Sequence, residues 1–174
     1  MRTDGWLVFF YFGDGEKRRG GRRGRPESRA GSRVLHLPPS YPELPERPAP
    51  EGLEPYDAVP LTAEVGLTIP GGDTPALARA FGFSDRSEYT KHPVGSAPFA
   101  AKLVARAVLG GGRLGWSDPR VLEEAERWTL LAQFDSDTDA GMGWGDCGVL
   151  YWLIRPEDLA ENRFEKAMFT WQCC

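Results

Sequence analysis

Apolar side chains gather in short runs of strand length along this chain, separated by residues that favour turns. The runs are Trp6–Phe12, Arg33–Leu37, Trp128–Phe134, Gly148–Ile154 and Lys166–Gln172. The runs 128–134 and 148–154 are continuously apolar and end at turn residues, which predicts two neighbouring strands that are buried on both faces.

Two further segments have features of a helix. The segment 98–109 places apolar residues at helical spacing and stops at a run of three glycines, 110–112. The stripe that we expect to face the core consists of Phe99, Leu103, Ala107 and Val108. Upstream, Thr74-Pro75 predicts the start of a short helix that ends near Gly82.

A third helix has the clearest start signal. In Ser117-Asp118-Pro119 an oxygen that can cap the helix precedes a proline in its first turn, which predicts a helix through about Arg127. We expect its acidic residues to lie on the solvent side; these are Glu123, Glu124 and Glu126.

Composition favours many short elements over long helices. The chain has 174 residues, the length of one domain, with 21 glycines and 15 prolines. Prolines between residues 38 and 60 predict an extended segment that wraps the surface. The expected fold is a single α+β, β-rich domain over residues 1–174, with mostly antiparallel sheets and two or three short packed helices.

One stretch of sequence is echoed within the chain. Residues 5–10 read Gly-Trp-Leu-Val-Phe-Phe and residues 148–153 read Gly-Val-Leu-Tyr-Trp-Leu, each a Gly-x-Leu followed by aromatic residues. Chance could produce this echo. The alternative is an internal repeat of two half-domains, each entering a central strand through a glycine turn.

Charge is distributed unevenly. Between Lys17 and Arg33 there are eight basic residues and one acid, Glu27, so the net charge of −4 is the sum of +7 on this segment and −11 on the remainder. The basic, glycine-rich stretch falls in a loop expected over residues 13–32. The sequence therefore predicts a basic arm on an acidic body.

The location of the protein follows from its apolar runs and its cysteines. The run 6–12 is far shorter than the roughly 20 residues of a membrane-spanning helix, and no cleavage site of a signal peptide follows it. Of the three cysteines, Cys173 and Cys174 are adjacent, so no disulfide framework is visible. We expect a cytoplasmic protein without a membrane partner.

The C-terminal region carries a family resemblance. It reads Leu-Leu-Ala-Gln-Phe-Asp-Ser-Asp over 130–137, Gly-Met-Gly-Trp-Gly-Asp-Cys-Gly-Val-Leu-Tyr-Trp-Leu-Ile over 141–154, Asp-Leu at 158–159 and Gln-Cys at 172–173. In order and spacing, residues 128–174 resemble the YwqG-like family of bacterial proteins, for which no activity is established. Weaker similarity extends to His92-Pro93-Val94-Gly95, to Gly5-x-Leu7 with Phe9-Phe10-Tyr11, and to residues 26–35.

This resemblance implies a β-rich fold with packed helices. It also implies a partner-binding or immunity-type role, because some members are encountered beside bacterial polymorphic toxins. Members carry a further N-terminal portion, so we expect either a natural short form or a start placed too late. A strand over 6–12 that lacks neighbours would expose an apolar face and edge, which predicts poor solubility or dimer formation.

The acidic loop between the runs 128–134 and 148–154 has one interpretation as a metal site. Asp135, Asp137, Asp139 and Asp146 occupy positions 1, 3, 5 and 12 of a twelve-residue loop, a pattern that suits Ca²⁺. Against Ca²⁺, position 6 is Ala140, position 12 is not the longer Glu, and the flanks are strands. The alternatives are a metal-dependent hydrolase at the same loop, or a hairpin whose aspartates hydrogen-bond their own backbone.

Catalytic residues are not indicated. The sequence lacks a nucleophile elbow, a phosphate loop and a His-Glu-x-x-His motif. Nothing in the sequence places His36 or His92, its two histidines, beside Cys147. We assign no catalytic residue and no cofactor other than the Ca²⁺ candidate.

The basic arm is a candidate for nucleic-acid binding through Arg18, Arg19, Arg22, Arg23 and Arg25. Because the arm over 17–25 contains no aromatic residue for base stacking, a solvated loop is the favoured interpretation.

The leading hypothesis is a non-enzymatic protein-interaction domain that binds a basic partner, such as a nuclease toxin. The expected contact surface includes Asp135, Asp137, Trp144 and Asp146, because they fall in the most specific motif. For Trp144 itself, packing at the edge of the core is the favoured interpretation over direct contact with a ligand.

Overall fold

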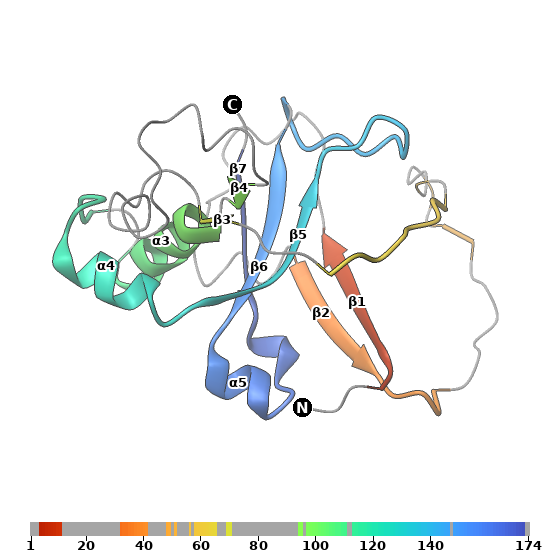
Figure 1. Ribbon diagram of the computed structural model, residues 1–174, viewed down its shortest axis with the longest axis horizontal. Coiled ribbons are helices and arrows are strands. Elements are labelled where there is room, and N and C mark those ends of the chain that lie inside the picture. The colour runs from red at the N-terminus through yellow and green to blue at the C-terminus, as the bar shows by residue number, and fades with distance from the viewer. Residues whose placement is uncertain are drawn as a thin grey trace.

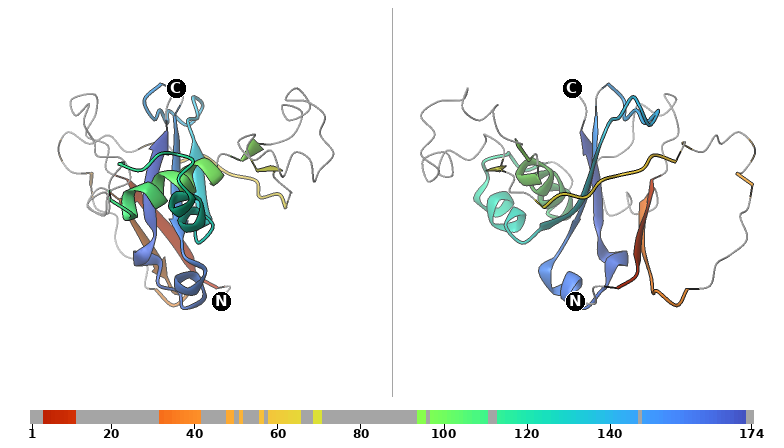
Figure 2. Two further views of the ribbon diagram at one scale, coloured as in Figure 1. Left: turned by 90° about the vertical axis from the view of Figure 1, so that its left-hand side faces the viewer. Right: turned by 45° about the vertical axis from the view of Figure 1, so that its right-hand side comes forward.

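The described part of the chain forms layers around one antiparallel sheet (Figures 1 and 2). The structure is a computed structural model, and it describes residues 4–11, 32–41, 48–49, 51, 56, 58–65, 69–70, 94–95, 97–110, 113–146 and 148–172. Helices cover one face of the sheet and a two-stranded ribbon covers the other, as the turned views in Figure 2 show. This is the expected α+β fold with antiparallel sheets and short helices.

The central sheet has the order β5-β6-β7 and comes from the C-terminal region. Its antiparallel strands are β5 (Thr129–Asp135), β6 (Val149–Ile154) and β7 (Met168–Gln172). Residues 150–154 of β6 are all buried, which confirms the prediction for this run. At the sheet edge β5 is only half-buried along most of its length, so burial on both faces was wrong for the run 128–134.

A ribbon of β1 (Trp6–Tyr11) and β2 (Ser32–Leu37) packs on one face of this sheet. Phe9 of β1 reaches Trp152 of β6, with ring centroids 5.3 Å apart in an edge-on arrangement. Val34 of β2 is buried in the same apolar cluster. The strand pair predicted on either side of the basic arm is therefore confirmed, and its inward side chains complete the core.

Gly5 and Gly148, which open the echoed segments, each have a backbone reason to be glycine. Gly5 has φ +114, which favours glycine, and a side chain there would meet the Leu37 carbonyl. A side chain at Gly148 would meet the carbonyl oxygens of Trp144 and Gln172. Only the second glycine leads into a strand at the centre of a sheet, since β1 pairs with β2 alone in the described part of the chain.

Helix α3 (Ala97–Val108) covers the opposite face of the sheet. Ala100 and Val104 are fully buried against Tyr151 and Leu153 of β6, and their small side chains let the helix approach closely. The predicted helix is confirmed, and Ala107 of the predicted stripe is buried, but the stripe as a whole does not face the core. Phe99 instead stacks on Trp116, with ring centroids 5.0 Å apart, and Val108 is 42% exposed.

Helix α4 (Pro119–Ala125) begins as the sequence predicts. The Asp118 side chain caps it by accepting a hydrogen bond from the Arg120 N–H at 3.0 Å. Arg120 donates hydrogen bonds to Asp118 from its side chain and from its backbone N–H. These bonds hold the pKa of Asp118 below its usual range, and the side-chain bond has the larger effect.

Glu124 is a correction to the predicted solvent face of α4, because it is only 7% exposed. Its Oε1 accepts a hydrogen bond from Trp128 Nε1 at 3.0 Å and one from Arg155 at 2.5 Å. The Arg155 guanidinium also lies 4.6 Å from the centre of a Trp128 ring. A carboxylate can be buried here because Arg155, which follows β6, neutralises it.

The other elements within the described ranges are short. They are β3 (Ile69–Pro70), which pairs in parallel with β4 (Val94–Gly95), the helix α5 (Pro156–Ala160) and the 3-10 turn η3 (Phe164–Lys166). The helix predicted over 74–82 lies outside the described residues, as does much of the proline-rich segment. Within the described ranges, none of the helices has the length and apolar character needed to cross a membrane.

We predict that Glu124→Ala lowers the free energy of unfolding by about 3 kcal/mol, because it leaves the charge of Arg155 without its carboxylate. For a chain of this size the melting temperature should fall by roughly 6–12 °C, measured by circular dichroism. Glu123→Ala, at an exposed position of the same helix, is the control and should change stability by less than about 0.5 kcal/mol. Equal melting temperatures for the two variants would contradict the proposed role of Glu124.

Candidate functional site

The loop that joins β5 to β6 is closed at its base by a serine. Ser136 donates from Oγ to the Gly148 carbonyl at 2.8 Å and accepts a hydrogen bond from the Trp144 N–H at 3.0 Å. The Ser136 N–H also donates to Gly148, at 3.0 Å. These bonds hold the two ends of the loop together, as expected for two extended segments joined by an acidic connector.

The tip of the loop is organised by Asp137. Its backbone exchanges two hydrogen bonds with Met142, both of 2.8 Å. Its Oδ1 accepts from the N–H groups of Asp139 and Ala140, at 2.8 and 3.1 Å. Gly141, with φ +65, completes the turn. The predicted hairpin loop with an aspartate bonded to its own backbone is thus the arrangement observed.

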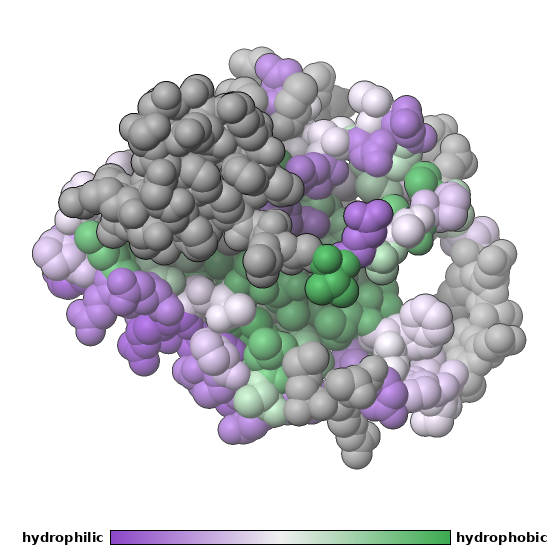
Figure 3. Space-filling view, in the orientation of Figure 1, coloured by the Kyte–Doolittle hydropathy of each residue, from purple (hydrophilic) through white to green (hydrophobic). Residues whose placement is uncertain are grey.

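The acidic side chains of the loop face solvent. Asp135, Asp137, Asp139 and Asp146 are all exposed, and the loop forms a hydrophilic projection at the upper right of Figure 3. Asp135 Oδ1 accepts a hydrogen bond from Gln133 Nε2 at 2.8 Å. The ion pairs found within the described ranges involve other carboxylates, those of Asp118, Glu124, Asp158 and Glu161.

These four carboxylates do not converge on one point. Among the described residues, no group of three His, Cys, Asp or Glu side chains could hold a metal ion. One oxygen of Asp137 is already used by the backbone of the turn. The arrangement favours the hairpin interpretation over a Ca²⁺ loop or a metal-dependent hydrolase.

Trp144 lies beneath the loop, not on its surface. It is 8% exposed and belongs to the core cluster, which agrees with the favoured packing interpretation. Two exposed tyrosines cover it edge-on, Tyr11 at 5.7 Å and Tyr56 at 5.8 Å between ring centroids. The aromatic surface next to the acidic loop is therefore made by these tyrosines, which sequence reasoning did not assign to the site because both lie outside the motif region 128–174.

Several candidates from the sequence are not brought to this site. The arginines of the basic arm, Cys147 and His92 lie outside the described residues. His36 is in β2, where its Nε2 lies 3.3 Å from the carbonyl oxygen of Asp4. Its ring contacts Phe164 at a centroid distance of 5.5 Å, so it belongs to the packing of the ribbon.

Comparison with protein families gave a match. A family described as a domain of unknown function (DUF1963) matches residues 3–173, which is nearly the whole chain. Comparison with curated proteins gave no match.

We predict that Asp137→Ala loosens the turn, because two backbone N–H groups lose their acceptor. A lost side-chain acceptor of this type costs about 1 kcal/mol, so hydrogen exchange at the Asp139 and Ala140 amides should be roughly fivefold faster. Asp137→Asn retains an oxygen acceptor and should preserve most of the protection. Asp139→Ala is the matched control for loss of an exposed carboxylate; if it speeds exchange as much as Asp137→Ala does, Asp137 does not organise the turn.

Proposed function

We propose that this chain, which belongs to the DUF1963 family, is a protein-interaction domain. Its loop between β5 and β6 would bind a basic partner protein. The observation that carries this proposal is the set of four exposed carboxylates on that loop. No cation among the described residues pairs with them. Their charge is thus free to attract a partner of opposite charge.

The tyrosines beside the loop support the same function. Tyr11 is 37% exposed and Tyr56 is 53% exposed, and both rest on the buried ring of Trp144. Aromatic residues that combine a large apolar area with a polar tip are enriched at protein interfaces. The tyrosines thus form an apolar surface next to the charged loop. A partner whose basic residues surround an apolar patch would complement this arrangement.

The construction of the loop favours binding without a large ordering cost. Its base is fixed by Ser136, its tip by Asp137, and Trp144 anchors it in the core. A surface that is already ordered loses less conformational entropy on association. The carboxylates can therefore contribute to both the rate of encounter and the lifetime of the complex.

The family resemblance of the motif region narrows the proposal. For a cytoplasmic protein of the YwqG-like type, an immunity role is one form of this binding: an acidic loop would cover the basic, nucleic-acid-binding surface of a nuclease toxin. The protein would then act by occupying that surface, and no catalytic step would be required of it.

We predict that neutralising the loop weakens binding of a basic probe. In Asp135/Asp137/Asp146→Asn, three exposed charges are lost, each worth about 0.5–1 kcal/mol at low salt, so the Kd for a fluorescent nona-arginine peptide should rise tenfold or more. Fluorescence anisotropy at about 50 mM salt measures the Kd, and the difference between the proteins should shrink at high salt. Asn retains the oxygen that caps the turn at position 137.

The control removes the same charge from another part of the surface. Glu123 on α4, Glu126 at the C-cap of α4 and Glu157 on α5 are exposed, and these helices lie away from the loop in Figure 1. Glu123/Glu126/Glu157→Gln should raise the Kd by less than threefold. An equal rise in Kd in the two triple variants would show that binding depends on net charge alone. That result would contradict the assignment of the loop as the binding surface.

A further inference from the structure

We propose that the outer face of the β1–β2 ribbon binds single-stranded nucleic acid, with bases stacked on Trp6 and Phe10. The inner face of the ribbon is fixed by Phe9, which packs on Trp152, and by Val34, which is buried in the core. Side chains alternate along a strand, so the neighbouring positions point away from the central sheet. The outer face consists of Trp6, Val8, Phe10, Arg33, Leu35 and Leu37. None of these residues belongs to the acidic loop, so this inference goes beyond the proposed function.

Two large aromatic side chains are exposed on this face. Trp6 is 69% exposed and Phe10 is 51% exposed. Among the described elements, no helix or strand covers the ribbon on the side away from the central sheet (Figure 2). The two residues are four positions apart on β1, which places them about 14 Å from each other. They therefore follow a line along the strand and offer aromatic surface on which nucleic-acid bases can stack.

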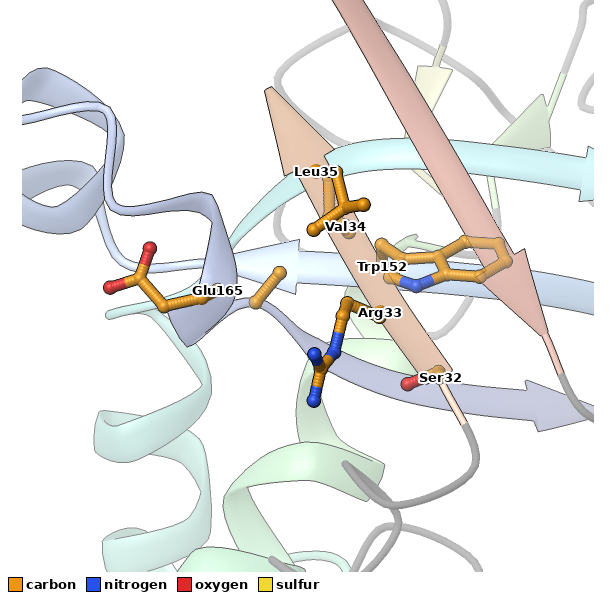
Figure 4. A pocket seen from close by; sticks show the side chains of 7 residues that line it. Ser32, Arg33, Val34, Leu35, Trp152 and Glu165 are labelled. Atoms are coloured by element: carbon orange, nitrogen blue, oxygen red, sulfur yellow. The ribbon is translucent and has the colours of Figure 1, made fainter. Parts of the chain in front are cut away.

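A cation lies beside one of these rings. Arg33 is directly opposite Phe10 in the register of the ribbon, and it is exposed. Figure 4 shows its guanidinium turned away from the buried indole of Trp152. Within the described ranges the ion pairs involve other arginines, and the outer face includes no acidic residue. A guanidinium next to an exposed ring suits the alternation of phosphate and base along a nucleic-acid strand.

The charge of the chain next to this face selects a polyanion as the ligand. The segment from Lys17 to Arg33 carries a net charge of +7 and runs directly into β2. A second copy of the chain would bring the same positive charge to the interface, which opposes the dimer that an exposed apolar strand would otherwise favour. In the sequence, the lack of an aromatic residue in the arm over 17–25 favoured a solvated loop. The strands that border the arm supply the missing rings.

The chemistry of the face favours a single strand over a duplex. Four of its six side chains have no hydrogen-bonding group with which to read base edges in a groove; these are Val8, Phe10, Leu35 and Leu37. In a duplex the faces of the bases are stacked on each other and are not accessible to the rings. A single strand leaves its bases free to stack on aromatic side chains.

The test measures the fluorescence anisotropy of a labelled, twelve-nucleotide oligothymidylate in about 50 mM salt. We expect a Kd on the order of 10 µM, in the range of binding that does not depend on sequence. An abasic oligomer of the same length carries the same charge without bases. It should bind at least fivefold more weakly, because stacking of one base is worth about that factor or more. An oligouridylate of equal length is measured alongside, and binding of either the DNA or the RNA supports the proposal.

Variants on the outer face separate stacking from attraction by charge. Trp6→Leu and Phe10→Leu stay apolar but lose a ring, and each should raise the Kd for the oligothymidylate at least fivefold. Trp116→Leu is the matched control and should leave the Kd unchanged, because Trp116 is 41% exposed but stacks on Phe99 of α3, on the other side of the sheet. Arg33→Gln should raise the Kd and reduce the slope of log K against log salt by about 0.7, the value for one phosphate contact on a single strand. Positions 6, 10 and 33 are exposed, so these variants are expected to fold, which circular dichroism checks.

Three results would overturn the proposal: no binding of either oligonucleotide up to about 200 µM protein, equal affinity for the abasic oligomer, or an unchanged Kd in both Trp6→Leu and Phe10→Leu. Binding of vesicles that contain phosphatidylserine, without binding of either oligonucleotide, would assign the face to a membrane surface and would overturn it as well. The nona-arginine assay of the acidic loop involves other residues and a probe of opposite charge. The two proposals can therefore fail separately.

Discussion

Burial of β6 on both faces is the constraint on which the described fold depends. Leu150, Trp152 and Ile154 point toward the β1–β2 ribbon, and Tyr151 and Leu153 point toward α3. Each fully buried side chain of this size contributes about 1.5–3 kcal/mol to the free energy of folding. It does so only if another layer of the structure covers it. Within the described ranges the sheet has three strands, so both covering layers are needed to exclude water from its centre. The order helix, sheet, ribbon follows from this requirement.

The same constraint connects the core to the acidic loop and to the aromatic packing around Trp152. The turn that enters β6 lets Gly148 receive the hydrogen bonds of Ser136, which fixes the base of the acidic loop. On the ribbon side, Phe9, Phe134 and Phe169 surround the indole of Trp152, with ring centroids 5.0–5.6 Å away. This aromatic packing sets the orientation of the ring, and its N–H is buried without a hydrogen-bond partner. Packing thus takes precedence over hydrogen bonding at this position.

Much of this architecture could be predicted from the sequence, because its strands are apolar runs bounded by turn residues. The predicted strand 148–154 differs by one residue from Val149–Ile154, and Asp118 begins α4 as its capping oxygen indicates. Glu124 was placed wrongly because local spacing does not reveal Arg155, which is 31 residues away in sequence. The cavity lined by Arg33, Trp152 and Glu165 could not be predicted for the same reason, since these residues meet only in the folded chain.

Buried and exposed carboxylates of this protein differ in a way that bears on function. Where stability requires it, an acid is neutralised: Glu124 meets Arg155, and Asp158 accepts from Arg163 at 2.8 Å. The acids of the β5–β6 loop have no such partner among the described residues, although their mutual repulsion opposes their clustering. Of these acids, Asp137 is the one that stabilises the turn, because its side chain accepts two backbone hydrogen bonds. The charges of Asp135, Asp139 and Asp146 add little to the stability of the fold, because uncharged side chains could take their places. Folding alone therefore does not account for these charges. A basic partner would.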